Sequence, residues 1–374
     1  MINYDITQTL DRIPREDWQH LCAQHPTLNY DFLKAMHDSG SVSARTGWGM
    51  LYLTAWSDDH CVGAIPCYLK SHSYGEYVFD WAWAEAYEQL GQPYYPKLLV
   101  AVPFTPVTGP RILGRDTSIK EKLVERLLAL EQEAKLSSTH CLFPQEEDAK
   151  LLSRKGFLVR EGVQFHWRNN GYRDFDDFLA SMNHDKRKKI KQERKKIQEH
   201  QISFSWLTGS AIKEEHWQFF AQCYRQTYRQ HVSTPYLNED FFNRFFDIGL
   251  PNCCLIVAYQ NNQMIACALN LFNQERAYGR YWGAMTFIPG LHFETCYYQS
   301  IAFCIAHNIP IFEGGAQGEH KLARGLTPVR TQSYHHVREP QFHRAVEDFL
   351  IREGRQIEHY RSELNEHAPF KKSD

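Results

Sequence analysis

The sequence has little of what marks several common classes of protein. Its ten cysteines include no C-x-x-C pair, so neither a zinc site nor a disulfide framework is indicated. The longest purely apolar runs, such as 98–102, fall far short of the roughly 18 residues that a membrane span needs. Residues 1–17 lack the apolar stretch of a signal peptide. We therefore expect reduced, buried thiols and a cytoplasmic protein.

The sequence also lacks a large net charge and three common nucleotide-binding or catalytic motifs. The formal net charge of −2 gives no overall attraction to nucleic acid, so any such argument must be local. The patterns G-x-x-x-x-G-K-[ST], G-x-S-x-G and H-E-x-x-H do not occur. Their absence leaves P-loop, serine hydrolase and zincin functions without support.

The chain of 374 residues is long for one compact core, which favours two domains. Hydrophobic residues make up 43% and charged residues 23%, an ordinary globular composition. Aromatic residues reach 14%, which indicates large cores or a cleft lined with flat rings.

Hydrophobic periodicity predicts the same order of elements twice. In the first half, alternation predicts strands at 50–56 and 61–69, and helical spacing predicts a helix at 119–136. A later strand is expected at 157–167. We expect an α/β (α+β) fold in which mixed, mostly antiparallel sheets are flanked by helices.

After a linker at 169–173, the second half is predicted to begin with one long helix at 176–200. A meander of three strands is expected at 253–259, 264–272 and 277–283. A helix at 293–307 and a closing helix at 344–360 complete the pattern. The expected domains are therefore 1–168 and 169–374.

The run 184–197 is dense in cations and contains only two carboxylates. Its Lys and Arg residues are Lys186, Arg187, Lys188, Lys189, Lys191, Arg194, Lys195 and Lys196. Such a helix face binds the phosphates of a nucleic acid or a cofactor, whereas the alternative is an ordinary solvated face. We select Lys186, Arg187, Lys189 and Arg194 as candidate phosphate-binding residues.

A glycine-rich, charged loop follows the short apolar strand at 309–312. Dense ionisable groups on a flexible backbone just past a strand end are typical of functional loops in α/β folds. The alternative is a surface loop with exposed charge. The candidate residues here are Glu313, Gly314, Gly315, Gln317, Glu319, His320, Lys321 and Arg324.

Two aromatic segments are further candidates for substrate binding. The junction 282–294 offers Trp282, His292 and Glu294 at a helix start, where a carboxylate also suits simple capping. The segment 74–87 holds six aromatic residues and three carboxylates, and from it we select Glu76, Asp80 and Trp81. Packing between the halves is the alternative to an aromatic-walled cleft. His292 and Glu294 have no third ligand at a recognisable spacing, so we expect no metal site.

Several of these segments resemble a known family. The segments SYGEYVFDW, YYPKL, PFTPVTGPR, GYRDFDDFLASM, PGLHFETCYYQ and FEGGAQGEHKLARGL are similar to the FemAB-like "peptidoglycan biosynthesis/recognition" proteins of the GNAT acyltransferase superfamily. The resemblance runs from about residue 20 to about residue 350. It implies two tandem GNAT-like domains. The basic run is similar to the segment that follows the domain linker in Fem aminoacyl transferases, which move an amino acid from aminoacyl-tRNA to a peptidoglycan-precursor amine.

The resemblance implies an N-acyltransferase in which an amine attacks an activated ester or thioester. We expect Glu313 or Glu319 to accept the proton, and Lys321 or Arg324 with the N–H groups of Gly314 and Gly315 to bind the oxyanion or a donor phosphate. No tightly bound cofactor is expected, because the donor is a co-substrate. Aminoacyl-tRNA and acyl-CoA both remain open as donors, although the GNAT pyrophosphate loop Q/R-x-x-G-x-G/A is absent. The expected acceptor is an amine-bearing small molecule or peptide. If aminoacyl-tRNA is the donor, the protein also binds tRNA. The alternative is a non-catalytic protein that recognises a cell-envelope precursor or a protein partner.

Overall fold

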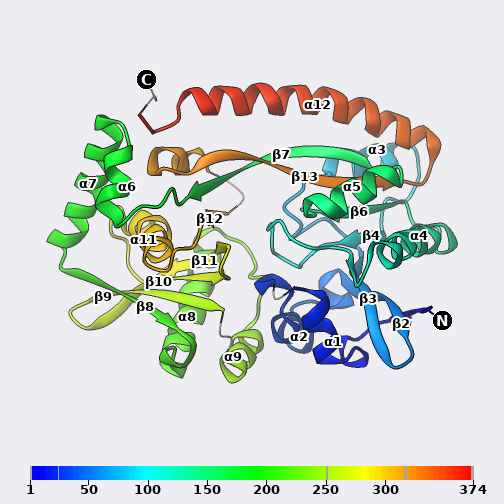
Figure 1. The fold of residues 1–374 in the computed structure, drawn as a ribbon, viewed down its shortest axis with the longest axis horizontal. Coiled ribbons are helices and arrows are strands. Elements are labelled where there is room, and N and C mark those ends of the chain that lie inside the picture. The colour runs from blue at the N-terminus through cyan, green and yellow to red at the C-terminus, as the bar shows by residue number, and fades with distance from the viewer. Residues whose placement is uncertain (1, 24, 250–251, 316–317, 372–374) are drawn as a thin grey trace. The chain divides into compact units, whose positions relative to one another are not determined.

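The computed structural model describes residues 2–23, 25–249, 252–315 and 318–371. The chain forms two compact units (Figure 1). Unit 1 contains Met1–Gly162 and Arg330–His359, and unit 2 contains Val163–Val329 and Tyr360–Asp374. The expected ranges 1–168 and 169–374 differ from these units chiefly in residues 330–359, which return to unit 1.

Unit 1 is built on a mixed sheet in the order β1-β2-β3-β4-β6-β13. Its strands are β1 (Ile2–Thr7), β2 (Trp48–Ser57), β3 (His60–Lys70), β4 (Lys97–Val100), β6 (Ser138–Leu142) and β13 (Thr327–Val337), with β5 (Leu113–Gly114) beside β3. All neighbours are antiparallel except β4 and β6, which are parallel. Its helices are α1 (Arg15–Leu21), α2 (Tyr30–Asp38), α3 (Trp81–Gln89), α4 (Thr117–Glu133) and α5 (Glu146–Arg154).

Unit 2 repeats this arrangement with the order β8-β9-β10-β11-β12-β7. Its strands are β8 (Ile202–Thr208), β9 (Cys253–Gln260), β10 (Gln263–Phe272), β11 (Arg276–Ala284), β12 (Ile311–Glu313) and β7 (Leu158–Arg168). Here too one pair, β11 and β12, is parallel and the others are antiparallel. The sixth strand of each sheet comes from another part of the chain. In sequence, β7 follows the elements of unit 1 but pairs in the unit 2 sheet, and β13 follows the elements of unit 2 but pairs in the unit 1 sheet.

The helices of unit 2 are α6 (Phe175–Ser181), α7 (His184–Glu199), α8 (Glu214–Gln230), α9 (Glu239–Ile248), α10 (Leu291–Phe293) and α11 (Gln299–Ala306). A π-helix, Glu294–Tyr298, joins α10 to α11, and a 3₁₀ helix, Glu319–Arg324, lies in the glycine loop. The long helix α12 (Pro340–Glu366) has residues in both units. None of the helices among the residues described is both long and apolar enough to cross a lipid bilayer.

The expected helix at 176–200 is wrong, because the chain forms α6 and α7 with a break between them. Met182 is extended and bridges to Phe370, and the side chain of Asn183 accepts a hydrogen bond from the Lys186 N–H. An asparagine in this capping position starts a new helix by satisfying one of the first free N–H groups. The break turns α7 into a separate helix whose apolar residues Ile190 and Ile197 are buried.

Each unit has its own hydrophobic core. In unit 1, Leu123 and Leu127 of α4 pack against Ile65 and Val100 of the sheet. In unit 2, Phe178, Ile256, Ile301 and Phe312 belong to one buried cluster. All ten cysteines lie in the described ranges; nine of them are buried and none forms a disulfide there.

Two adjacent residues of β11 show that different elements pack on the two faces of the unit 2 sheet. A Cβ on Gly283 would lie 2.2 Å from the Cys223 carbonyl oxygen of α8, so this face accepts a closely packed helix. The preceding side chain, Trp282, instead packs its ring 4.9 Å from the ring of His292. Since successive strand residues point to opposite faces, α8 lies on the face opposite to His292.

Candidate functional site

The predicted residues of the glycine loop between β12 and β13 differ in their exposure to solvent. Lys321 and Arg324 are each 3% exposed, whereas Glu319 and His320 are exposed. The 3₁₀ helix that carries all four begins after Gly318, whose φ of +107° is readily adopted by glycine but rarely by other residues. Gln317 lies outside the described residues.

Lys321 is a buried cation with no counter-charge in the described structure. Its Nζ donates a hydrogen bond to the Gly315 carbonyl oxygen at 2.9 Å. None of the described carboxylates lies within ion-pair distance of this Nζ. Burial lowers the pKa of Lys321 to about 8, so the ammonium form still predominates at neutral pH. An oxyanion or anionic group bound here would meet a desolvated positive charge.

Arg324 is already neutralised by α7. Its guanidinium donates to Glu193 Oε1 at 3.0 Å and to the His320 carbonyl at 2.6 Å. Its Cζ lies 3.3 Å from the centre of the Phe293 ring. These contacts fix the loop against α7 and α10, so Arg324 has a clear structural role beside the one predicted for it.

The two carboxylates predicted as bases lie in contrasting surroundings. Glu313 is 2% exposed, and Arg276 donates to its Oε1 at 2.8 Å. His166 lies 3.8 Å from Glu313 Oε2, and burial lowers the pKa of this imidazole to about 3, so it is neutral. Glu319 is exposed and accepts a 2.6 Å hydrogen bond from the Tyr360 hydroxyl. Only Glu319 of this pair is open to an incoming amine.

The backbone of the glycine loop is tightly held. The Gly314 N–H donates to the Phe165 carbonyl at 3.1 Å, so it is engaged within the fold. A Cβ on Gly314 would lie 2.4 Å from Leu326 Cδ2, which excludes any larger residue without rearrangement. Gly315 has φ +88°, where a residue with a side chain is strained. The Lys321 ammonium is therefore the better candidate for an oxyanion donor.

His292 and Trp282 form an aromatic cluster with the loop. The His292 ring lies 4.9 Å from Trp282 and 6.2 Å from His320. The Tyr297 hydroxyl and His320 Nε2 are 3.1 Å apart. Burial lowers the pKa of His292 to about 4, so this ring is neutral at physiological pH. The cluster brings together residues that were predicted from two separate segments.

Glu294 is a structural anchor in this structure. Arg194 Nε lies 3.2 Å from both oxygens of the buried Glu294 carboxylate, and Gln299 Nε2 donates to Oε1 at 2.8 Å. The Arg194 guanidinium also lies 4.4 Å from the Phe175 ring centre. Arg194 thus holds α7 to the π-helix, and its charge is largely used within unit 2.

The other cations of α7 gather on its solvent side. A shallow hollow of about 310 Å³ is lined by His184, Arg187, Lys188, Lys191, Gln192 and Lys195. These positions recur at helical spacing and form a stripe on one face. Lys186 is half-buried, and Lys189 is exposed beside the stripe. We call the six hollow-lining residues the α7 stripe.

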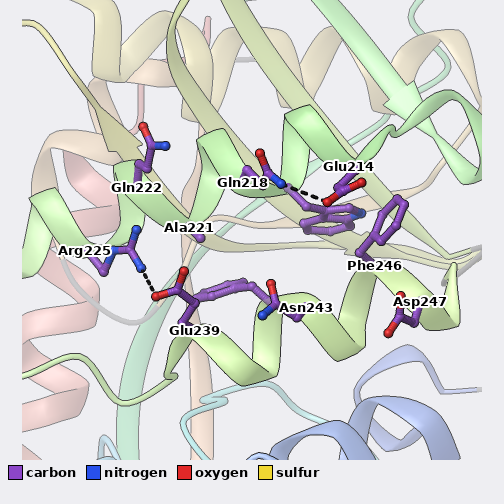
Figure 2. Close-up of a pocket in the computed structure, with 11 residues that line it drawn as sticks. Glu214, Gln218, Ala221, Gln222, Arg225, Glu239, Asn243, Phe246 and Asp247 are labelled. Atoms are coloured by element: carbon purple, nitrogen blue, oxygen red, sulfur yellow. Dashed lines mark hydrogen bonds and ion pairs between the residues drawn. The ribbon is translucent and has the colours of Figure 1, made fainter.

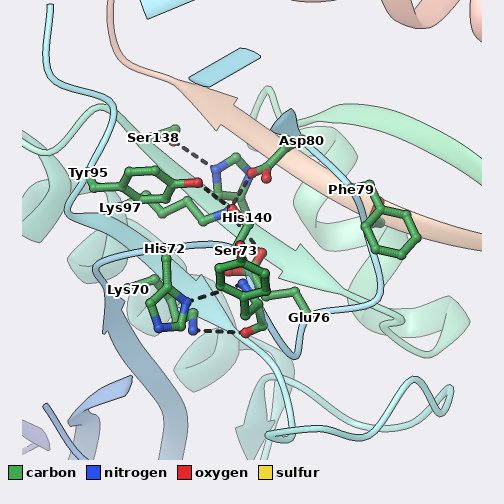
Figure 3. A network of polar contacts seen from close by, with 12 residues as sticks. Lys70, His72, Ser73, Glu76, Phe79, Asp80, Tyr95, Lys97, Ser138 and His140 are labelled. Atoms are coloured by element: carbon green, nitrogen blue, oxygen red, sulfur yellow. Dashed lines mark hydrogen bonds and ion pairs between the residues drawn. The ribbon is translucent and has the colours of Figure 1, made fainter. Parts of the chain in front are cut away.

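The predicted residues of unit 1 lie around a buried lysine that the sequence reasoning missed (Figure 3). Lys97 Nζ donates to Glu76 Oε2 at 2.8 Å and also to Asp80. All three side chains are almost fully buried. Burial raises the pKa of Glu76 to about 7. Burial acts in the same sense on Asp80, but the Lys97 charge outweighs it and lowers the pKa of Asp80 to about 2.

Further buried groups extend this network, whereas Trp81 is exposed and packs its ring 5.1 Å from that of Tyr74. Lys70 Nζ lies 3.7 Å from the centre of the Trp48 ring, and burial lowers its pKa to about 7. His140 bonds to Tyr94 and is neutral, since burial lowers its pKa to about 3. Lysine at the end of an apolar strand, as in KLLV at 97–100, is a signal that could have revealed Lys97.

No cluster of three or more His, Cys, Asp or Glu side chains suited to a metal occurs in the ranges that the structure describes.

The two units share one strand order with a single parallel pair in each sheet, so the fold is a tandem repeat of a mixed sheet flanked by helices. The family model FemAB-like, described as peptidoglycan biosynthesis/recognition, matches residues 9–372, and the chain belongs to this family. The structure of FemX aligns with a TM-score of 0.53 and 11% identity, covering 92% of this chain and 100% of that one. L-PGS from Bacillus licheniformis aligns with a TM-score of 0.50 and 10% identity, covering 83% and 91%. No curated protein matches the chain in sequence.

Proposed function

We propose that the protein is an N-acyltransferase that moves an aminoacyl group from aminoacyl-tRNA onto an amine, with a cell-envelope precursor as the acceptor class. The observation that carries the proposal is the Lys321 ammonium, which is buried beside the glycine loop without a counter-charge among the described residues. Family membership supports the acceptor class, since the family is described by peptidoglycan biosynthesis and recognition.

Lys321 has the chemistry that acyl transfer requires. When an amine attacks an ester carbonyl, negative charge develops on the carbonyl oxygen. A preformed cation in a dehydrated site stabilises that charge more than water does, and one such donor is worth about 3–4 kcal/mol. The 2.9 Å bond to Gly315 and the close walls of the loop fix the ammonium before the substrate arrives.

Glu319 is the proposed proton acceptor. The amine nitrogen forms a bond to the carbonyl carbon and loses a proton to Glu319, and the ester C–O bond then breaks. The proton passes to the departing ribose oxygen, so charge and atoms balance. The Tyr360 hydroxyl, 2.6 Å from Glu319, orients the carboxylate. Glu313 remains bound to Arg276 and holds the end of β12.

The α7 stripe supports tRNA as the carrier of the donor. It presents Arg187, Lys188, Lys191 and Lys195 on one solvent-exposed face of unit 2. Phosphate contacts made by such a face release counterions, so binding weakens steeply with salt. Aminoacyl-tRNA is the co-substrate, which places the reaction in the cytoplasm and requires no resident cofactor.

The test is single-turnover transfer from radiolabelled aminoacyl-tRNA to lysine-containing peptide acceptors, with acetyl-CoA as the competing donor. Labelled acceptor that forms only with aminoacyl-tRNA, together with salt-sensitive tRNA binding, supports the proposal. Transfer from acetyl-CoA alone would replace the donor. Acceptor binding without transfer from either donor, unaffected when Glu319 and Lys321 are substituted, would make the protein a recognition module.

A further inference from the structure

Unit 2 contains a groove that the proposed reaction does not use. It lies between α8 and α9 and has a volume of about 440 Å³. It opens on the side of the sheet where α8 packs against Gly283, opposite to His292 and the glycine loop. The helices are antiparallel across it, so Glu214 and Asp247 lie at one end and Arg225 and Glu239 at the other (Figure 2).

The floor of the groove is aromatic. Trp217, Phe242 and Phe246 line it. Beneath the floor, Trp217 meets Phe245 with ring centres 4.9 Å apart, and Phe242 meets Phe220 at 5.5 Å. These contacts hold α8 and α9 together, so the groove is a fixed feature of the helix pair.

The middle of the groove is lined with primary amides. Gln218, Gln222 and Asn243 are among its lining residues, and Gln218 donates to Glu214 at 2.9 Å. The side chains of Gln222 and Asn243 make no hydrogen bond to any described residue. A primary amide donates and accepts at once, which matches the alternating N–H and C=O groups of a peptide backbone.

At the end of the groove that holds Glu214 and Asp247, none of the described lining residues is a cation. Asp247 lies in the last turn of α9 and has no ion pair or hydrogen bond with any described residue. A carboxylate there meets the negative end of the helix dipole, where a positive group is favoured. A bound ammonium group would offset two unfavourable interactions of the Asp247 carboxylate, one with the helix dipole and one with the nearby Glu214 carboxylate.

A second hollow continues the groove along α8 toward positive charge. It has a volume of about 470 Å³ and is lined by Gln222, Arg225, Gln226, Arg229, Glu239 and Met285. Arg225 is paired with Glu239 at 2.8 Å, which leaves Arg229 as the cation not paired with a described carboxylate. From Glu214 to Arg229 the helix rises about 22 Å, the length of about seven extended residues.

We propose that this groove binds an extended peptide, with an ammonium group at Glu214 and Asp247 and a carboxylate at Arg229. The proposal goes beyond the transfer reaction and does not depend on it. Charge complementarity selects a zwitterionic occupant, the amides select a peptide backbone, and the aromatic floor accepts its apolar side chains. A nucleic acid is disfavoured by the acid end, and a purely apolar partner helix is disfavoured by the lining of amides and charges.

The test is calorimetric titration at low salt with a seven-residue peptide of alanine and glutamine that starts with lysine and has free ends. Two blocked versions serve as ligand controls, one acetylated on both amines and one amidated at the C-terminus. We expect each block to weaken binding about tenfold, as loss of one charged contact does. Asp247→Asn should weaken the free peptide equally and remove its advantage over the acetylated version. Arg229→Gln should do the same for the amidated version.

Glu215→Gln is the matched protein control, because Glu215 is exposed on α8 but does not line the groove. Lys321→Met should bind the peptide as the wild type does, which separates this site from the transfer reaction. No binding of the free peptide at millimolar concentration would overturn the proposal. So would equal effects of Asp247→Asn and Glu215→Gln. A dimer in solution that Asp247→Arg dissociates would show a second copy of the chain as the occupant, which also overturns it.

Discussion

The buried lysine of unit 1 gives a sharp prediction, because its two carboxylate partners should respond in opposite directions. Asp80 has a folded pKa of about 2, below its ordinary 3.8, whereas Glu76 has a folded pKa of about 7, above its ordinary 4.5. A lowered carboxylate pKa stabilises the fold above the ordinary value, and this stability is lost as pH falls through about 2. A raised pKa stabilises the fold only at low pH, and this stability is lost as pH rises through about 7.

The magnitudes follow from these differences, since a factor of ten in an acid constant is about 1.4 kcal/mol. Asp80→Asn should lower the free energy of unfolding at pH 8 by about 2 kcal/mol, because it removes a favourably ionised partner of Lys97. Glu76→Gln should be close to neutral or stabilising at pH 8, because it removes a carboxylate whose ionisation burial opposes. Lys97→Met should cost about 3–5 kcal/mol, because both carboxylates then lose their buried cation.

The assay is urea unfolding followed by tryptophan fluorescence at pH 5 and pH 8. Glu76→Gln should gain stability relative to the wild type between these pH values, and Asp80→Asn should show no such change. Equal destabilisation by the two substitutions at pH 8 would refute the assignment of opposite charge preferences.

Three more outcomes are expected. Replacing Lys191 and Lys195 of the α7 stripe together by Gln should weaken tRNA binding and reduce the slope of log affinity against log salt by about 1.5. Gly314→Ala should destabilise unit 2 by about 2 kcal/mol, since its Cβ would lie 2.4 Å from Leu326 Cδ2, whereas Gly354→Ala meets open space within α12 and should stabilise by about 0.5–1 kcal/mol. The native thiols should resist a disulfide reagent until the protein unfolds, because nine of the ten are buried.

The tRNA-binding outcome has a matched control, and each of the three outcomes has a result that would contradict it. Lys150→Gln removes an exposed cation of unit 1 that is paired with Glu146, so tRNA binding should not change. An unchanged salt slope in the Lys191 and Lys195 variant would remove the stripe from the proposal. A Gly314→Ala protein as stable as the wild type would show that the loop yields readily. Rapid labelling of native thiols would contradict their burial.

Local patterns predicted much of the fold. The meander at 253–283 and the helix α4 were predicted because strand alternation and helical spacing depend only on residues close together in the sequence. The edge strand β1 was missed, since three of its six residues are exposed and two of these, Asn3 and Asp5, are polar. The exchange of β7 and β13 could not be predicted, because strand pairing between segments more than 140 residues apart does not affect local periodicity.

The candidate site was predicted in part for the same reason. Lys321 and Arg324 stand together in one glycine-rich loop, so sequence reasoning found them. Their partners were not predicted: Glu193 lies on α7 and Phe293 on α10, and contacts over such distances depend on the tertiary fold. Lys97 was missed because a lysine is usually exposed, although its place beside the apolar run of KLLV could have drawn attention to it; its buried carboxylate partners become evident in the structure.

The most direct test of the proposed function is single-turnover aminoacyl transfer by Lys321→Met, compared with the wild type and with Lys150→Met as an exposed control. We expect a rate lower by about 10²–10³ at pH 7, with tRNA binding unchanged, because one oxyanion donor is lost. We also expect the wild-type rate to fall as pH rises through about 8, where the Lys321 ammonium loses its proton. A Lys321→Met enzyme that transfers at the wild-type rate, with the same pH profile, would show that Lys321 does not bind the oxyanion.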